Sequence, residues 1–268
     1  MSKNATHPPT LRPTGEPYER FMGRWSRQLA PRYIAWLAQR HGQRWLDVGC
    51  GTGAMSQAIA DHAAPKHLIG VDPSEPLLAC TNETLAHRFE GHVADAESLP
   101  LADGAVDVTV SLLVLDALPH PMAAMREMQR VTRSGGTLAA AVWDYALRMR
   151  ALRIFWDAAI SIDPGAERFD EARRHPLCQS EALGALFERA GLQAVRTGSI
   201  EIETRFASFD DYWLPFVVGQ GAAPTYVAGL NEAHRQRLRR ALRSRVPVGP
   251  GGAISLAARA WVVRGVVV

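Results

Sequence analysis

A glycine-rich turn between a short strand and a helix constrains this chain more than any other feature. Residues 45–48 read as a short apolar strand interrupted by one acid, Asp47. Three glycines then alternate over residues 49–53, and residues 54–63 (AMSQAIADHA) are composed of helix formers. Glycine permits positive φ and close approach of a ligand, and the N-terminus of the next helix offers unpaired N–H groups to an anion. The stretch predicts a nucleotide-sized binding site.

The glycine turn alone leaves alternatives open. A GxGxG pattern also opens dinucleotide-binding folds, and a plain tight turn between strand and helix has a similar composition. A second observation narrows the choice. Asp72 ends the apolar segment 67–72 (HLIGVD), roughly 20 residues beyond the turn, where a carboxylate can accept both hydroxyls of a ribose.

With these motifs in place, the chain resembles the class I S-adenosylmethionine-dependent methyltransferases. The likeness is to the small-molecule group, methyltransferase type 11, that includes quinone-biosynthesis enzymes. The first motif of that family is similar to LDVGCGTG, which stands unaltered at residues 46–53. The resemblance covers residues 18–143, and beyond them only the general shape is similar. It continues through VDPS at 71–74, ADAE at 94–97 with LP at 99–100, and the segments 107–115 and 130–136.

The resemblance implies a site for S-adenosylmethionine, with S-adenosylhomocysteine as the product. Asp72 would accept the ribose hydroxyls, Asp95 would face the exocyclic amine of adenine, and the Ala96 backbone would lie at a ring nitrogen. Arg24 is expected near a carboxylate of the cofactor, although its aromatic neighbours could simply anchor a helix. The implied cofactor-binding residues are Arg24, Asp47, Gly49, Cys50, Gly51, Asp72, Pro73, Asp95, Ala96, Glu97 and Leu113.

The resemblance also implies the fold. We expect an α/β, Rossmann-like, doubly wound and mostly parallel seven-stranded sheet with helices on both faces and helical insertions that form a substrate cap. The strands are expected at 45–48, 67–72, 91–94, 106–115, 137–143, 192–206 and 256–267, with a turn at 133–136. The domain organisation expected is a disordered tail at 1–17 and one methyltransferase domain at 18–268, with a cofactor-binding half at 41–143 and cap insertions at 144–179 and 207–250.

Composition and charge limit the classes of protein to which this chain can belong. With 268 residues, of which 47% are hydrophobic and 21% charged, the chain suits one α/β domain with insertions. The three cysteines form no CxxC pair and no zinc pattern, so we expect free thiols in a reducing cytoplasm and no metal site. The polar N-terminus does not resemble a signal peptide, and no apolar run approaches the ~20 residues of a membrane span. A soluble cytoplasmic protein is expected.

A basic segment near the C-terminus raises the question of nucleic acid. Six arginines lie within residues 235–245, with Leu238 and Leu242 four positions apart. We interpret this segment as an amphipathic helix with a solvated basic face, and nucleic acid or an acidic partner as the alternative. The net charge of +3 does not argue for nucleic acid by itself. The oligomeric state, monomer or homodimer, stays open.

The acceptor is inferred by elimination. Transfer of a methyl group from a sulfonium depends mostly on positioning, so a dedicated nucleophile is not required. The segment after the fourth strand lacks the Asp/Asn-Pro-Pro-Tyr/Phe motif of amino-methylating DNA enzymes, and no Pro-Cys pair suits methylation of cytosine carbon. No histidine pair or acidic cluster indicates a metal-dependent reaction. A small organic acceptor remains, in a pocket walled by Tyr18, Trp143, Tyr212 and Trp213.

No catalytic residue is identified from the sequence. A general base could be Asp116, His120 or Asp144, and the sequence does not choose among them. It does not decide between oxygen, nitrogen and carbon as the methylated atom either.

Three functions stay open at this point. The first is a small-molecule methyltransferase, and the second is a cofactor-binding regulator or partner without catalysis. The third is a nicotinamide-dependent oxidoreductase, against which stand the missing third fingerprint glycine after Gly53 and the absence of a Tyr-x-x-x-Lys pair.

Overall fold

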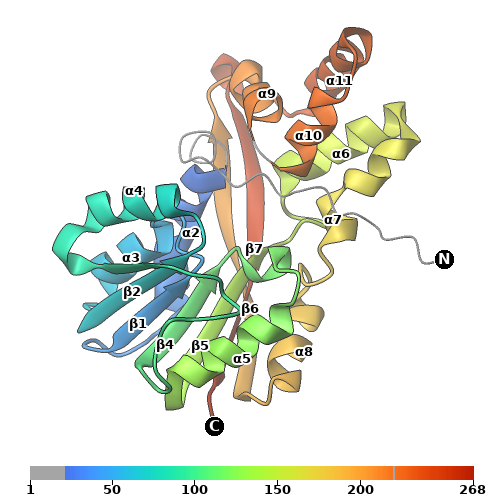
Figure 1. Cartoon of the computed structure of the whole chain (residues 1–268). Helices are drawn as coiled ribbons and strands as arrows, with labels where there is room; N and C mark the ends of the chain where they lie inside the picture. Colours follow the sequence, from blue (N-terminus) through green and yellow to red (C-terminus); the bar gives the residue numbers. More distant parts are fainter. Residues whose placement is uncertain (1–21, 220) are drawn as a thin grey trace.

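The computed structural model describes residues 22–219 and 221–268, so the predicted tail at 1–17 lies outside the described residues. The described chain is organised around a seven-stranded sheet of order β3-β2-β1-β4-β5-β7-β6 (Figure 1). Among the described strands, β7 runs opposite to the other six, which confirms the predicted mostly parallel α/β fold. The strands are β1 (Arg44–Val48), β2 (His67–Asp72), β3 (Glu90–Val93), β4 (Val106–Leu112), β5 (Thr132–Trp143), β6 (Gln193–Phe206) and β7 (Ile254–Val266).

Strand β1 lies where the order of the strands reverses. It pairs in parallel with β2 on one side and with β4 on the other, so the chain winds outward from β1 in both directions. Strand β4 (VDVTVSL) is buried along nearly its whole length, as expected for a parallel strand covered on both faces. In open α/β sheets ligands bind outside the carboxyl ends of the strands at such a reversal. The fold therefore directs attention to the ends of β1, β2 and β4.

Helices cover both faces of the sheet, as predicted. On one face Tyr33 of α2 and Ile59 of α3 pack with Val108 of β4. On the other face Met125 of α5 packs with Leu46 of β1, and α8 extends this layer. The helices outside the insertions are α2 (Arg24–Leu37), α3 (Ala54–His62), α4 (Glu75–Leu85), α5 (Pro121–Val131) and α8 (Ser180–Arg189), with the 3-10 turns η2 (Ala86–Arg88) and η3 (Leu115–Ala117).

Two helical insertions form a cap beyond the sheet. In Figure 1 helices α6 and α9 to α11 gather at the far end of the long strands β6 and β7. Their aromatic side chains hold them together: the rings of Phe155 and Phe216 are stacked with centroids 4.4 Å apart, and Tyr226 packs edge-on to Phe155. The cap comprises α6 (Arg150–Ile162), η4 (Pro164–Phe169), α7 (Glu171–Arg174), α9 (Phe209–Val218), α10 (Ala222–Ala228), α11 (Glu232–Arg245) and η5 (Pro250–Gly252).

The arginine-rich segment is the amphipathic helix that its pattern predicted. Helix α11 buries Leu238 and Leu242, while Arg237, Arg240 and Arg243 are exposed. In the part of the chain that the structure describes, no helix is both long and apolar enough to cross a membrane.

Two predicted boundaries in the middle of the sheet were wrong. Strand β5 begins at Thr132 instead of 137, because Thr132 pairs with Val106 and the Gly135 N–H donates to the Val267 carbonyl at 2.8 Å. Between Thr132 and Thr137 the register with β4 shifts and Gly135 has a positive φ of 72°, so the predicted turn is an irregularity within the strand. Strand β4 ends at Leu112 instead of 115, because Leu113 has a positive φ of 63° and turns the chain away from the sheet.

Candidate functional site

The glycine turn joins β1 to α3 in a conformation that favours glycine. Gly49, Gly51 and Gly53 have φ values of 75°, 53° and 83°, in the left-handed region that other residues rarely adopt. A Cβ on Gly49 would lie 2.4 Å from a side-chain carbon of Val114. The backbone of the turn therefore lies directly against the chain that follows β4, and space for a side chain is absent at this position.

Hydrogen bonds fix the turn to the neighbouring strand and helix. The Gly49 and Cys50 N–H groups both donate to the Val71 carbonyl, at 2.7 and 3.1 Å. From α4 the Thr81 hydroxyl donates to the Gly51 carbonyl at 2.8 Å. The turn is thus held on two sides before any ligand binds.

Asp72, at the end of β2, is oriented by two backbone amides. Its Oδ2 accepts the Gly51 N–H at 2.9 Å, and its Oδ1 accepts the Ser74 N–H at 2.8 Å. Ser74 precedes α4, and its side chain makes no capping hydrogen bond to that helix. Asp72 and the following Pro73 therefore form a fixed edge of the glycine turn.

Asp47 lies beneath the turn and is completely buried. Its Oδ2 accepts the Ser56 hydroxyl of α3 at 2.6 Å, whereas its Oδ1 is buried without a hydrogen-bond partner among the described residues. Burial, together with the nearby charge of Asp72, raises the pKa of Asp47 to about 7. The buried Tyr33 hydroxyl has no described partner either. A buried, unsatisfied carboxylate oxygen suits a cationic or hydrogen-bond-donating ligand group.

The predicted adenine-binding turn follows β3. The Asp95 Oδ1 accepts the Glu97 N–H at 2.9 Å, so the acid orders its own turn. Asp95 is exposed, while Ala96 is buried between its two acidic neighbours. On the adjoining side of the site, the Leu113 N–H donates to the Ala141 carbonyl at 2.8 Å after the end of β4. Residues predicted from separate motifs thus follow the carboxyl ends of neighbouring strands.

Two arginines of α2 approach the site differently. Arg24 stacks over the rings of Trp25 and Phe206, and its Nη1 lies 3.6 Å from Asp211 of α9. Its Nε and Nη2 are buried without hydrogen-bond partners among the described residues. Arg27, which the sequence analysis did not single out, donates from Nη2 to the Thr52 carbonyl in the glycine turn at 3.3 Å. Helical spacing alone would have placed Arg27 one turn from Arg24.

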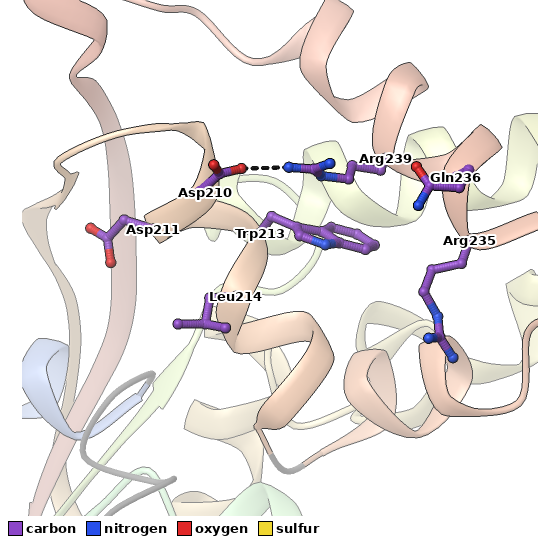
Figure 2. A pocket seen from close by; sticks show the side chains of 7 residues that line it. All are labelled: Asp210, Asp211, Trp213, Leu214, Arg235, Gln236 and Arg239. Atoms are coloured by element: carbon purple, nitrogen blue, oxygen red, sulfur yellow. Dashed lines mark hydrogen bonds and ion pairs between the residues drawn. The ribbon is translucent and has the colours of Figure 1, made fainter. Parts of the chain in front are cut away.

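A cavity of about 510 Å³ lies in the cap between α9 and α11 (Figure 2). Trp213 and Leu214 line it from α9, and Arg235 and Gln236 line it from α11. Beside this cavity, Asp210 of α9 and Arg239 of α11 form an ion pair at 2.7 Å that links the two helices.

The predicted acceptor walls separate into three groups. Trp213 lines the cavity in the cap. Tyr212 and Trp143 are buried in the core, where the Tyr212 hydroxyl donates to the Ala151 carbonyl at 2.9 Å. Tyr18 lies outside the described residues.

The three candidate bases differ in their surroundings. His120 is exposed at the start of α5. Asp144 is buried and bound to Arg259, with oxygen–nitrogen distances of 2.9 and 2.6 Å, so it is occupied as a structural ion pair. Asp116 lies 3.3 Å from Nδ1 of His175, a residue that the sequence analysis did not consider.

The arrangement around the glycine turn fits the cofactor that the motifs imply. A small, positively charged nucleoside derivative needs an uncrowded backbone turn, an oriented carboxylate at the end of β2 and an acceptor for a cationic group. Gly49, Asp72 and the unsatisfied Oδ1 of Asp47 supply these three features.

Comparisons with known proteins point in the same direction. Residues 46–140 match the family described as a methyltransferase domain. A malonyl-[acyl-carrier protein] O-methyltransferase of Pectobacterium atrosepticum is 37% identical over 129 residues, and the chain spans only 47% of its length. The ubiquinone/menaquinone biosynthesis C-methyltransferase UbiE of Burkholderia cenocepacia is 29% identical over 178 residues, which are 61% of this chain and 72% of that protein.

A solved structure extends the likeness to the whole fold. A candidate methyltransferase of Bacillus halodurans superposes with a TM-score of 0.58 at 16% identity, over 88% of this chain and 97% of that one. Because the identity is low, this likeness concerns the fold alone.

Proposed function

We propose that this chain, which belongs to the S-adenosylmethionine-dependent methyltransferases, transfers a methyl group to a small organic acceptor by in-line displacement. The observation that carries the proposal is the glycine turn. It is bonded to the Asp72 carboxylate and lies against Val114 at the carboxyl ends of β1, β2 and β4. When bound, S-adenosylmethionine supplies an electrophilic methyl group on a sulfonium.

The residues around the glycine turn have separate roles in this proposal. Asp72, whose carboxylate plane is fixed by the Gly51 and Ser74 amides, holds the ribose hydroxyls. Asp95 and Ala96 border the adenine, with Glu97 and Leu113 beside them. The turn itself is shaped by Gly49, Cys50, Gly51 and Pro73. Asp47 faces the amino group of the cofactor, and Arg24 faces its carboxylate.

The acceptor binds beneath the cap in this proposal. We propose that residues 18–268 form one domain. It has a cofactor-binding half at 41–143 and cap insertions at 144–179 and 207–250. Trp213 and its cavity offer an apolar wall for the part of the acceptor that does not react. Because the three cysteines are free thiols, we place the protein in the reducing cytoplasm.

Calorimetric titration of the purified protein with S-adenosylhomocysteine, with NAD as the control, tests the proposal. We expect micromolar binding of S-adenosylhomocysteine and no binding of NAD. Binding of NAD alone would assign the glycine turn to a dinucleotide and overturn the proposal. Transfer of labelled methyl to an acceptor then separates an enzyme from a binding protein without catalysis.

A further inference from the structure

A buried acid and a histidine from distant parts of the chain meet in the segments that follow β4 and α7. Asp116 belongs to η3, directly after β4, and His175 follows α7 in the first insertion. The His175 Nδ1 lies 2.9 Å from the Asp116 backbone carbonyl and 3.3 Å from its Oδ2. The Asp116 side chain is only 6% exposed, while 23% of the His175 side chain is exposed. The acid is thus enclosed and the imidazole remains accessible.

The partners of Nδ1 determine the tautomer of His175. Both groups within reach of Nδ1, the carbonyl and the carboxylate of Asp116, are hydrogen-bond acceptors. Nδ1 must therefore carry the hydrogen, and in the neutral ring Nε2 keeps its lone pair. Across residues 22–219 and 221–268 no hydrogen bond to Nε2 occurs. This leaves Nε2 able to accept a proton.

Other groups hold the pair in place. The Cys178 N–H donates to the His175 carbonyl at 3.0 Å, and the Cys178 side chain lies near the Asp116 carboxylate. The ring of Tyr145 lies beside the imidazole, with centroids 5.6 Å apart. Glu171 and Asp144 are the further acids near Cys178. The imidazole is therefore fixed from the segments that follow β4, β5 and α7.

The pair belongs to segments that follow the carboxyl ends of the strands, as the glycine turn does. Val114, whose side chain touches Gly49, is two residues before Asp116. Tyr145 is two residues beyond the end of β5. Both belong to the carboxyl ends of neighbouring parallel strands, where ligands of such sheets bind.

We propose that His175, positioned by Asp116, is the general base that deprotonates a hydroxyl-bearing acceptor during methyl transfer. This inference rests on the proposed function. As the acceptor oxygen forms its bond to the methyl carbon, the carbon–sulfur bond breaks and its electron pair stays on the sulfur. The acceptor proton passes to Nε2 of His175 and leaves to water afterwards. Proton removal by a positioned base contributes about 10²- to 10⁴-fold to such a step.

The structure favours His175 over the other candidate bases. Asp144 is bound by Arg259, and protonating it would break a buried ion pair. No described side chain orients the exposed His120. Asp116 itself is too enclosed to reach an acceptor, and its role is to position the ring.

Nitrogen NMR of the histidine side chains tests the pair without any acceptor or cofactor. At pH 8 we expect a protonated Nδ1 and an unprotonated Nε2 for His175, with the resonances assigned by their loss in His175→Gln. Protonation of Nε2 instead of Nδ1 would remove the lone pair on which the proposal depends and overturn it.

Methyl transfer to two phenols tests the catalytic role. Phenol is neutral at pH 8 and needs a base, whereas 4-nitrophenol is largely ionised and does not. With labelled S-adenosylmethionine we expect His175→Gln to lower kcat for phenol by about 100-fold or more, and for 4-nitrophenol by less than about 5-fold. The control His120→Gln should change neither, and Asp116→Asn should lower kcat for phenol selectively.

The outcomes separate this inference from the proposed function. Equal losses for both phenols in His175→Gln, with unchanged binding of S-adenosylhomocysteine, would make His175 structural and overturn the inference. If wild-type protein binds S-adenosylhomocysteine but methylates neither phenol, the hydroxyl class of acceptor is overturned. Failure to bind S-adenosylhomocysteine at all would instead contradict the proposed function.

Discussion

The Gly51 N–H donates to the Asp72 carboxylate at 2.9 Å, so the glycine turn and the acid at the end of β2 are parts of one structure. The same carboxylate also accepts the Ser74 N–H at 2.8 Å. These two bonds fix its plane relative to the turn. A carboxylate held in this way loses little conformational freedom when it binds two hydroxyl groups.

Replacing Asp72 should therefore remove cofactor affinity. We expect Asp72→Ala to weaken binding of S-adenosylhomocysteine at least about tenfold, because charge-assisted hydrogen bonds contribute about 1.5–3 kcal/mol each. Calorimetry measures the loss. Asp61→Ala is the control, since Asp61 is an exposed acid paired with Arg88 on the surface. Unchanged affinity in Asp72→Ala would remove Asp72 from the ribose site.

Two glycines with the same φ separate backbone strain from crowding. Gly49 and Gly42 both have φ of 75°, but a Cβ on Gly42 meets nothing within 4 Å. We expect both alanine variants to lose about 1–2 kcal/mol of stability through strain, measured by urea denaturation. Only Gly49→Ala should lose more and weaken S-adenosylhomocysteine binding, because its Cβ would displace Val114. Equal losses of stability in the two variants would mean that the Val114 side chain moves aside without a free-energy cost.

The local structure around the glycine turn could be predicted because its determinants are local. Residues 46–53 contain a strand end, a glycine turn and a helix start in unbroken sequence, and Asp72 follows at the spacing that a strand–helix–strand unit requires. The seven-stranded, mostly parallel sheet, the helices on its two faces and the amphipathic α11 agree with the fold expected from the sequence. Their apolar patterns reflect burial of one face of each element, which a sequence reveals well.

The acceptor side could not be predicted in the same way. Asp116 and His175 are 59 residues apart and belong to a turn and a loop, so no periodicity relates them. Tyr212 looked like a pocket wall because aromatic residues suit ligands, but the packing of the cap encloses it. Arg27 could not be recognised from the sequence, because it binds the backbone carbonyl of Thr52 and such a contact requires no particular side chain at residue 52.

Two arginines of α2 are candidates to bind the carboxylate of the cofactor in the proposed site. We expect Arg24→Met to weaken S-adenosylhomocysteine binding about tenfold, and Arg27→Met to weaken it less. Arg24 has two buried donors without a described partner, whereas Arg27 is exposed and already bonded to Thr52. Asp211→Asn should leave affinity unchanged and so controls for the ion pair to α9. A larger loss in Arg27→Met would transfer the role to Arg27.

The buried Asp47 should make the stability of the ligand-free protein depend on pH. Burial raises its pKa to about 7 from the ordinary value of 3.8, so the folded state binds its proton more tightly than the unfolded chain does. The resulting stabilisation is present at pH values below about 4 and is lost as pH rises through the window from about 4 to 7. Its size is at most about 4 kcal/mol, at about 1.4 kcal/mol per pKa unit.

Asp47→Asn tests this dependence because the amide does not ionise. We expect the free energy of unfolding, measured by urea denaturation, to fall less steeply between pH 4 and 7 in the variant than in wild-type protein. The variant should therefore gain stability relative to wild type as pH rises. Glu171→Gln is the comparison variant. Burial also raises the pKa of Glu171, which lies in the cap, to about 7, so this substitution should reduce the pH dependence of stability in a similar way. Parallel profiles for Asp47→Asn and wild type would show that Asp47 stays ionised in the fold, with its unsatisfied oxygen served by another group.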